Sequence, residues 1–239
     1  MRYAPSRQML LALGLSLPAL GLWPTPVRAE AEIWPSFETR IPVSDGEYGL
    51  PNTFRFYTEA RYGREFPGIG SVLLRYGPMW AVHPQVSLGL NLTSNVGRSA
   101  ADTVYDPELR LELEPNFFVR WGAFTLNDRS RLEHHWHASG TAWRYRNQCR
   151  LSYHPEGSQW IPFVGDEVFV EFAGPALSEN RFLVGVGYVP ADGVQTNLSL
   201  MARARAGDAG AWDHALVLVF GMLYSPKNPP VFELDGNAN

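Results

Sequence analysis

The chain has 239 residues, enough for one large domain, with 20 basic and 24 acidic residues and a formal net charge of −4. That balance gives no reason to expect nucleic acid as a partner, and a single cysteine, Cys149, excludes an internal disulfide. All basic residues except Lys227 are arginine, which is favoured where planar, paired charge contacts form in confined space. A GC-rich genome would give the same bias.

Residues 1–29 differ from the rest of the chain. Two arginines precede an apolar run over Met9–Trp23, and small residues follow it. This is the pattern of a secretory signal peptide, and the run is short for a spanning helix, which needs about 20 residues. We therefore expect cleavage after Ala29, with Ala31 nearly as good, and an exported mature chain.

From residue 30 onwards the dominant pattern has a period of two residues. In the segment 108–114 every even residue is charged and every odd residue is leucine. Segments 129–137 and 143–153 also gather arginine and other polar residues on one face. Because successive side chains of a strand point to opposite sides, such segments are predicted to be two-faced strands. In chain order the expected strands are 33–41, 54–62, 70–82, 86–94, 108–114, 129–137, 143–153, 161–172, 181–189, 194–205 and 214–224.

Turn residues separate these segments, and nothing between them reads as a helix or a domain linker. We expect one domain over residues 30–224 and a tail over residues 225–239.

The hairpin between the 129–137 and 143–153 strands allows its pairing register to be predicted from the sequence. If Ser139 and Gly140 form a two-residue turn, Glu133 lies opposite Arg146 and both polar faces fall on the same side.

Two-faced strands fit either a soluble barrel with its apolar face inward or a membrane barrel with that face toward lipid. Strands of about 9–13 residues are long enough to cross a bilayer when tilted. Aromatic residues near strand ends suit interfacial girdles. These are Trp34, Phe54, Trp80, Trp121, Trp136, Trp143, Tyr145, Tyr153, Trp160 and Tyr224.

We therefore expect an all-β, antiparallel, up-and-down transmembrane β-barrel of about 10–12 strands in the outer membrane of a Gram-negative bacterium. Its expected partners are outer-membrane lipid and the barrel-assembly machinery. Bacterial barrels normally have an even number of strands, whereas eleven segments are found. Either ten strands form the barrel and 33–41 lies apart, or a twelfth strand has been missed.

Short motifs in the same order support this fold. They include Leu73–Pro78, Asp128–Glu133, Trp143–Arg146 and Glu179–Tyr188. Across residues 32–224 the chain resembles the bacterial family known as domain of unknown function 2490, thought to be outer-membrane barrels. The resemblance implies the barrel and its location, and it implies no activity or cofactor. The chain departs from the family pattern at His135, where arginine is usual, and in its long extension beyond Tyr224.

Charged residues on the polar faces are expected to meet in the lumen. They are Glu38, Arg40, Arg55, Glu59, Arg61, Arg110, Glu112, Glu114, Arg129, Arg131, Glu133, Arg144, Arg146, Arg150, Glu167, Glu171 and Arg181. Rings of side-chain charge can select solutes. The same residues could instead fill a narrow interior as a salt-bridged plug. We favour a plug or narrow conduit over a wide pore.

A metal site is a weaker hypothesis. His135 and His137 share a strand face, and Glu133 could supply a third zinc ligand. Neighbouring arginines would repel a dication, so no metal or cofactor is expected.

A lipid-modifying enzyme is weaker still. Ser130, His134 and Asn147 would all face outward, but Ser130 and His134 would lie about 13 Å apart, too far for direct proton transfer.

The leading hypothesis is a narrow channel or transport-related barrel for small polar solutes. The alternative is a non-conducting barrel that supports the envelope.

Overall fold

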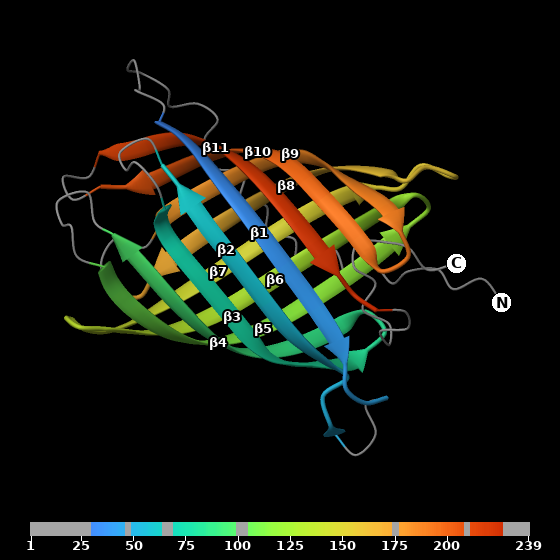
Figure 1. Ribbon diagram of the computed structural model, residues 1–239, viewed down its shortest axis with the longest axis horizontal. Coiled ribbons are helices and arrows are strands. Elements are labelled where there is room, and N and C mark those ends of the chain that lie inside the picture. Colours follow the sequence, from blue (N-terminus) through green and yellow to red (C-terminus); the bar gives the residue numbers. More distant parts are fainter. Residues whose placement is uncertain are drawn as a thin grey trace, which may run out of the picture.

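A computed structural model describes residues 30–45, 49–63, 69–98, 105–173, 177–207 and 211–226. The expected signal peptide and all but two residues of the expected tail lie outside these ranges. Within them eleven strands form one closed barrel (Figure 1). The strands are β1 (Glu30–Pro42), β2 (Thr53–Tyr62), β3 (Ile69–His83), β4 (Val86–Arg98), β5 (Tyr105–Trp121), β6 (Phe124–His137), β7 (Gly140–Tyr153), β8 (Trp160–Glu171), β9 (Leu177–Ala191), β10 (Val194–Ala206) and β11 (Trp212–Tyr224). No helix in the described ranges is long and apolar enough to cross a membrane.

Consecutive strands pair antiparallel, which confirms the up-and-down order. The barrel closes through a parallel pair formed by β1 and β11, whose register runs from Glu30↔Ala215 to Thr39↔Tyr224 (Figure 1). On its other side β1 pairs with β2. The expectation of an even strand number is therefore wrong for the described residues, because a parallel seam lets an odd number close. The 33–41 segment belongs to the barrel. The start of β1 and the end of β11 consequently lie at opposite ends of the barrel.

The β6–β7 hairpin has a different register from the expected one. His137 pairs with Gly140, so Ala138 and Ser139 form the turn and Glu133 lies opposite Arg144. Gly140 stands just after the turn with a φ of 136°, a value that side chains disfavour. The error is a shift of two residues, which leaves every side chain on its expected face. Alternation alone could not distinguish the two registers.

The charged faces point into the barrel and the leucine faces point outward. On β5, Leu111 is 43% exposed whereas the adjacent Glu112 is fully buried. Large exposed hydrophobic side chains occur on every strand, including Phe56 on β2, Val184 on β9 and Leu218 on β11. The polar interior and apolar exterior expected of a membrane barrel are thus what the structure has.

The interior is not uniformly charged. Trp34, Met201, Ala215 and Val217 form a small buried apolar cluster. These residues come from β1, β10 and β11, so the inner wall around the parallel seam is apolar. The ion pairs described next come mainly from β2 to β9.

Candidate functional site

The centre of the charged wall is a group of fully buried side chains on β5 and β6. Glu112 lies directly opposite Glu133, a like-charge pair that is unfavourable by itself. Arg131 lies between the carboxylates, 3.5 Å from Glu112 and 3.6 Å from Glu133. Its Nε donates to Glu114 Oε2 at 2.7 Å. One guanidinium therefore compensates three carboxylates.

Two further arginines extend this group toward β2. Arg75 donates to both carboxylate oxygens of Glu112, from Nε at 2.7 Å and from Nη2 at 3.3 Å. Arg55 Nη2 donates to Glu114 Oε1 at 2.8 Å and to Asn91 Oδ1 at 3.0 Å. Because both carboxylates are bound from two sides, each lies in a fixed position within the lumen.

On the other side the network continues to β9. Arg144 Nε donates to Glu133 Oε2 at 2.7 Å, and Arg146 Nε donates to Glu167 Oε1 at 2.6 Å. Glu167 also accepts from Arg181 at 3.3 Å and lies 3.6 Å from Arg129. The structure thus joins ion pairs from β2 to β9 into one network, as a plug requires.

Not every predicted lumenal residue joins this network directly. Glu38 pairs with Arg40 at 2.5 Å, and Glu59 pairs with Arg61 at 2.7 Å, in each case along a single strand. Arg150 lies over the ring of Phe163, 3.6 Å from its centroid. Arg110 pairs with Glu108, whereas Glu171 does join the network, 3.6 Å from Arg144.

Two lumenal residues differ from the expectation: Arg75 was not predicted in the lumen, and Trp34 was predicted elsewhere. Arg75 is the only charged residue in the 70–82 segment, so no charged alternation pointed to it. Trp34 was expected in an interfacial girdle, but it is 2% exposed and lies inside the barrel. Arg61 lies 4.1 Å and Arg181 5.0 Å from the centre of its ring, so it is a platform for cations. Trp34 points inward because it lies four residues before Glu38 on β1, so both side chains are on the same face of the strand.

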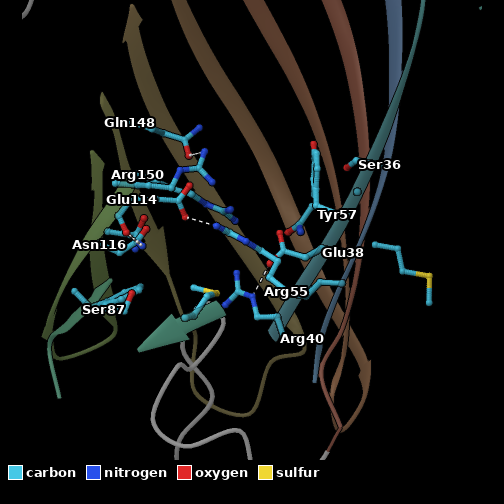
Figure 2. Close-up of a pocket in the computed structure, with 18 residues that line it drawn as sticks. Ser36, Glu38, Arg40, Arg55, Tyr57, Ser87, Glu114, Asn116, Gln148 and Arg150 are labelled. Atoms are coloured by element: carbon cyan, nitrogen blue, oxygen red, sulfur yellow. Dashed lines mark hydrogen bonds and ion pairs between the residues drawn. The ribbon is translucent and has the colours of Figure 1, made fainter. Parts of the chain in front are cut away.

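A cavity of about 190 Å³ opens in the lumen toward the end where β1 and β11 finish (Figure 2). Its charged lining consists of Glu38, Arg40, Arg55, Glu114, Arg129 and Arg150, four arginines against two glutamates. In Figure 2 the Arg55–Glu114 contact forms part of this lining. A neighbouring cavity of about 160 Å³ shares small residues, including Ser36 and Gly221, with the first. The two cavities also share Gln148, Arg150 and Asn197, so long polar side chains and small residues line this space together.

The outward-facing trio does not form a catalytic arrangement. Ser130 Oγ lies 2.9 Å from Tyr145 Oη and accepts from Asn147 Nδ2 at 3.1 Å. The His134 ring packs instead against Trp136 and Trp143, with both ring centroids 4.4 Å away. No contact joins Ser130 to His134 in the structure, so the lipid-modifying hypothesis loses its geometric basis.

These features define a class: a closed β-barrel with an apolar exterior and an ion-paired interior. The chain matches the family described as "Protein of unknown function (DUF2490)" over residues 31–214, and it belongs to that family. No curated protein and no solved structure matches the chain. The expected family resemblance is confirmed, and the family description carries no activity.

Proposed function

We propose that the protein is an outer-membrane β-barrel whose narrow lumen admits small polar solutes. The observation that carries the membrane placement is the inversion of the two faces, with buried glutamates alternating with exposed leucines along β5. Soluble monomers rarely expose contiguous apolar patches larger than a few hundred Å². Here exposed apolar side chains occur on all eleven strands.

Strand length and aromatic placement also support a bilayer. The strands have 10–17 residues, at least the length that a tilted strand needs to cross the hydrocarbon core. Exposed tryptophans lie at both barrel ends: Trp121 and Trp160 at the end where β11 finishes, Trp136, Trp143 and Trp212 at the other. Two such girdles are typical of transmembrane barrels. The N-terminal pattern of residues 1–29 supports export, with assembly machinery and outer-membrane lipid as partners.

The lumen favours a narrow conduit over a porin-like pore. The Arg131 group fills part of the cross-section, and the cavities hold only about 190 and 160 Å³. The larger cavity has more arginines than glutamates in its lining, so small anions should be preferred over cations.

A non-conducting envelope barrel is the second candidate, and the full burial of Glu112, Glu114 and Glu133 favours it. Recording current across planar bilayers that contain the purified protein separates the two candidates. Small unitary currents with anion preference support the conduit. Absence of current through protein that is demonstrably folded in the bilayer supports the structural barrel and overturns the conduit.

A further inference from the structure

Three possible metal ligands converge inside the barrel at the end opposite the cavity. Glu108 comes from β5, and His135 and His137 come from the last residues of β6. One carboxylate oxygen and one ring nitrogen from each histidine all lie within 4.8 Å of one another. Glu108 Oε1 contacts His135 Nδ1 and lies 3.3 Å from His137 Nε2. One carboxylate oxygen therefore faces both imidazoles.

We propose that Glu108, His135 and His137 form a binding site for Zn²⁺. Zinc binds imidazole nitrogen and carboxylate oxygen at about 2.0–2.2 Å in tetrahedral geometry, which sets neighbouring ligand atoms about 3.3–3.6 Å apart. The 3.3 Å between Glu108 and His137 falls in this range, whereas Glu108 and His135 are in closer hydrogen-bond contact and would have to separate when the ion binds. Two nitrogens and one oxygen, with a fourth position open to water, suit zinc better than Mg²⁺ or Ca²⁺, which prefer oxygen ligands.

The residues behind the ligands hold them in the required orientation. His135 Nε2 lies 3.0 Å from Glu133 Oε2, so with Nδ1 on the metal its other N–H would donate to a carboxylate. Such a carboxylate–histidine contact commonly orients a zinc-bound imidazole. Glu133 is itself bound by Arg144 at 2.7 Å. Glu133 therefore serves as a support for His135 rather than as the third ligand that the sequence suggested.

Glu108 is oriented in the same way. Its Oε2 accepts from Arg110 and from Asn95, the latter at 3.3 Å, and this leaves Oε1 for the imidazoles. Arg110 and Arg144 would repel an isolated dication, but each already pairs with a glutamate, Glu108 or Glu133. The metal would displace the proton that the His135–Glu108 contact otherwise needs, so binding adds one net positive charge rather than two.

An ion could reach the site from solvent. His137 is the last residue of β6 and its side chain is 32% exposed, whereas Glu108 and His135 are buried. The site does not depend on the lumen conducting, so it goes beyond the proposed function.

The test is Zn²⁺ binding by the tag-free mature protein, refolded in detergent and stripped with chelator. Calorimetric titration with Zn²⁺ alone, and metal analysis after gel filtration, should give one ion per chain. His137→Gln should weaken binding at least tenfold and should leave the barrel intact, because the side chain lies at a strand end. Glu133→Gln, which removes the support of His135 and also a carboxylate partner of Arg131 and Arg144, should weaken binding about 10–100-fold in protein shown to be folded.

His134→Gln is the matched control, because it removes the adjacent histidine, which lies on the outward face and packs against two tryptophans. It should bind Zn²⁺ like the parent protein. A tenfold excess of Mg²⁺ should not compete. Absence of binding in the folded parent, or parent-like binding by His137→Gln, would overturn the site.

Discussion

Arg131 and Glu114 form a charge pair inside the barrel in which the guanidinium is 1% exposed and the carboxylate is fully buried. Arg131 Nε donates to Glu114 Oε2 at 2.7 Å, while Arg55 binds the other carboxylate oxygen at 2.8 Å. Removing one partner of such a pair leaves a buried charge without compensation, which is costly. The ion-pair network should therefore be cooperative.

Arg131→Met should lower the free energy of unfolding by about 3–5 kcal/mol, because three glutamates lose the cation between them. Urea unfolding of the refolded barrel, followed by tryptophan fluorescence, measures the change. Arg40→Met is the control, since its pair with Glu38 is partly exposed and should be worth no more than about 1 kcal/mol. Equal losses in the two variants would contradict a central plug.

The parallel seam between β1 and β11 can be tested by disulfide cross-linking in a Cys149→Ser background. Ile33 pairs with Leu218 and Phe37 with Met222. Cysteines at either pair should form a disulfide when an oxidant is added, seen as a mobility change on a denaturing gel that a reductant reverses.

The mixed pair, Ile33→Cys with Met222→Cys, is the control. In the parallel seam these positions are four residues out of register, about 13 Å, which is beyond disulfide reach. If β1 and β11 instead paired antiparallel about the same midpoint, Ile33 would lie opposite Met222. The mixed pair would then cross-link and the matched pairs would not. Cross-linking of the mixed pair but not the matched pairs would exclude the parallel closure.

Leu113→Arg tests the outward direction of the leucines. Leu113 is the middle residue of β5 and is exposed on the barrel exterior. In the proposed membrane placement an arginine there should cost about 2–4 kcal/mol in lipid vesicles, whereas Val119→Arg, nearer the strand end, should cost about 0–1 kcal/mol. If Leu113→Arg leaves stability unchanged, the exterior does not face lipid.

Arg150→Glu should change the ion preference of any current through the barrel. The substitution turns four arginines and two glutamates in the cavity lining into three of each. The reversal potential in a salt gradient should therefore shift toward cation preference. Arg120→Glu, outside this lining, should leave it unchanged. A conducting barrel with the same selectivity in both variants would place the ion path elsewhere.

Much of the fold was predictable because alternation is a local signal. The Glu108–Glu114 segment alone shows that one face is charged and the other leucine, and each predicted strand segment overlaps an observed strand. Alternation does not decide which face points inward, and the buried Glu112 shows that the charged face does.

The rest depended on contacts between distant parts of the chain. The β1–β11 seam joins strands from the two ends of the chain, and no local pattern states whether such a pair is parallel. The β6–β7 register differed by two residues, a shift that preserves alternation. Glu108 approaches His135 and His137 only through the pairing of β5 with β6, so sequence spacing favoured Glu133 as the third ligand.

The most direct test of the central claim is fractionation of expressing cells, with boiled and unboiled samples compared on a denaturing gel. A closed, lipid-facing barrel should be found in the outer-membrane fraction and should migrate differently before and after boiling. A soluble periplasmic protein with the same mobility in both samples would contradict the membrane placement and, with it, the proposed passage through the lumen.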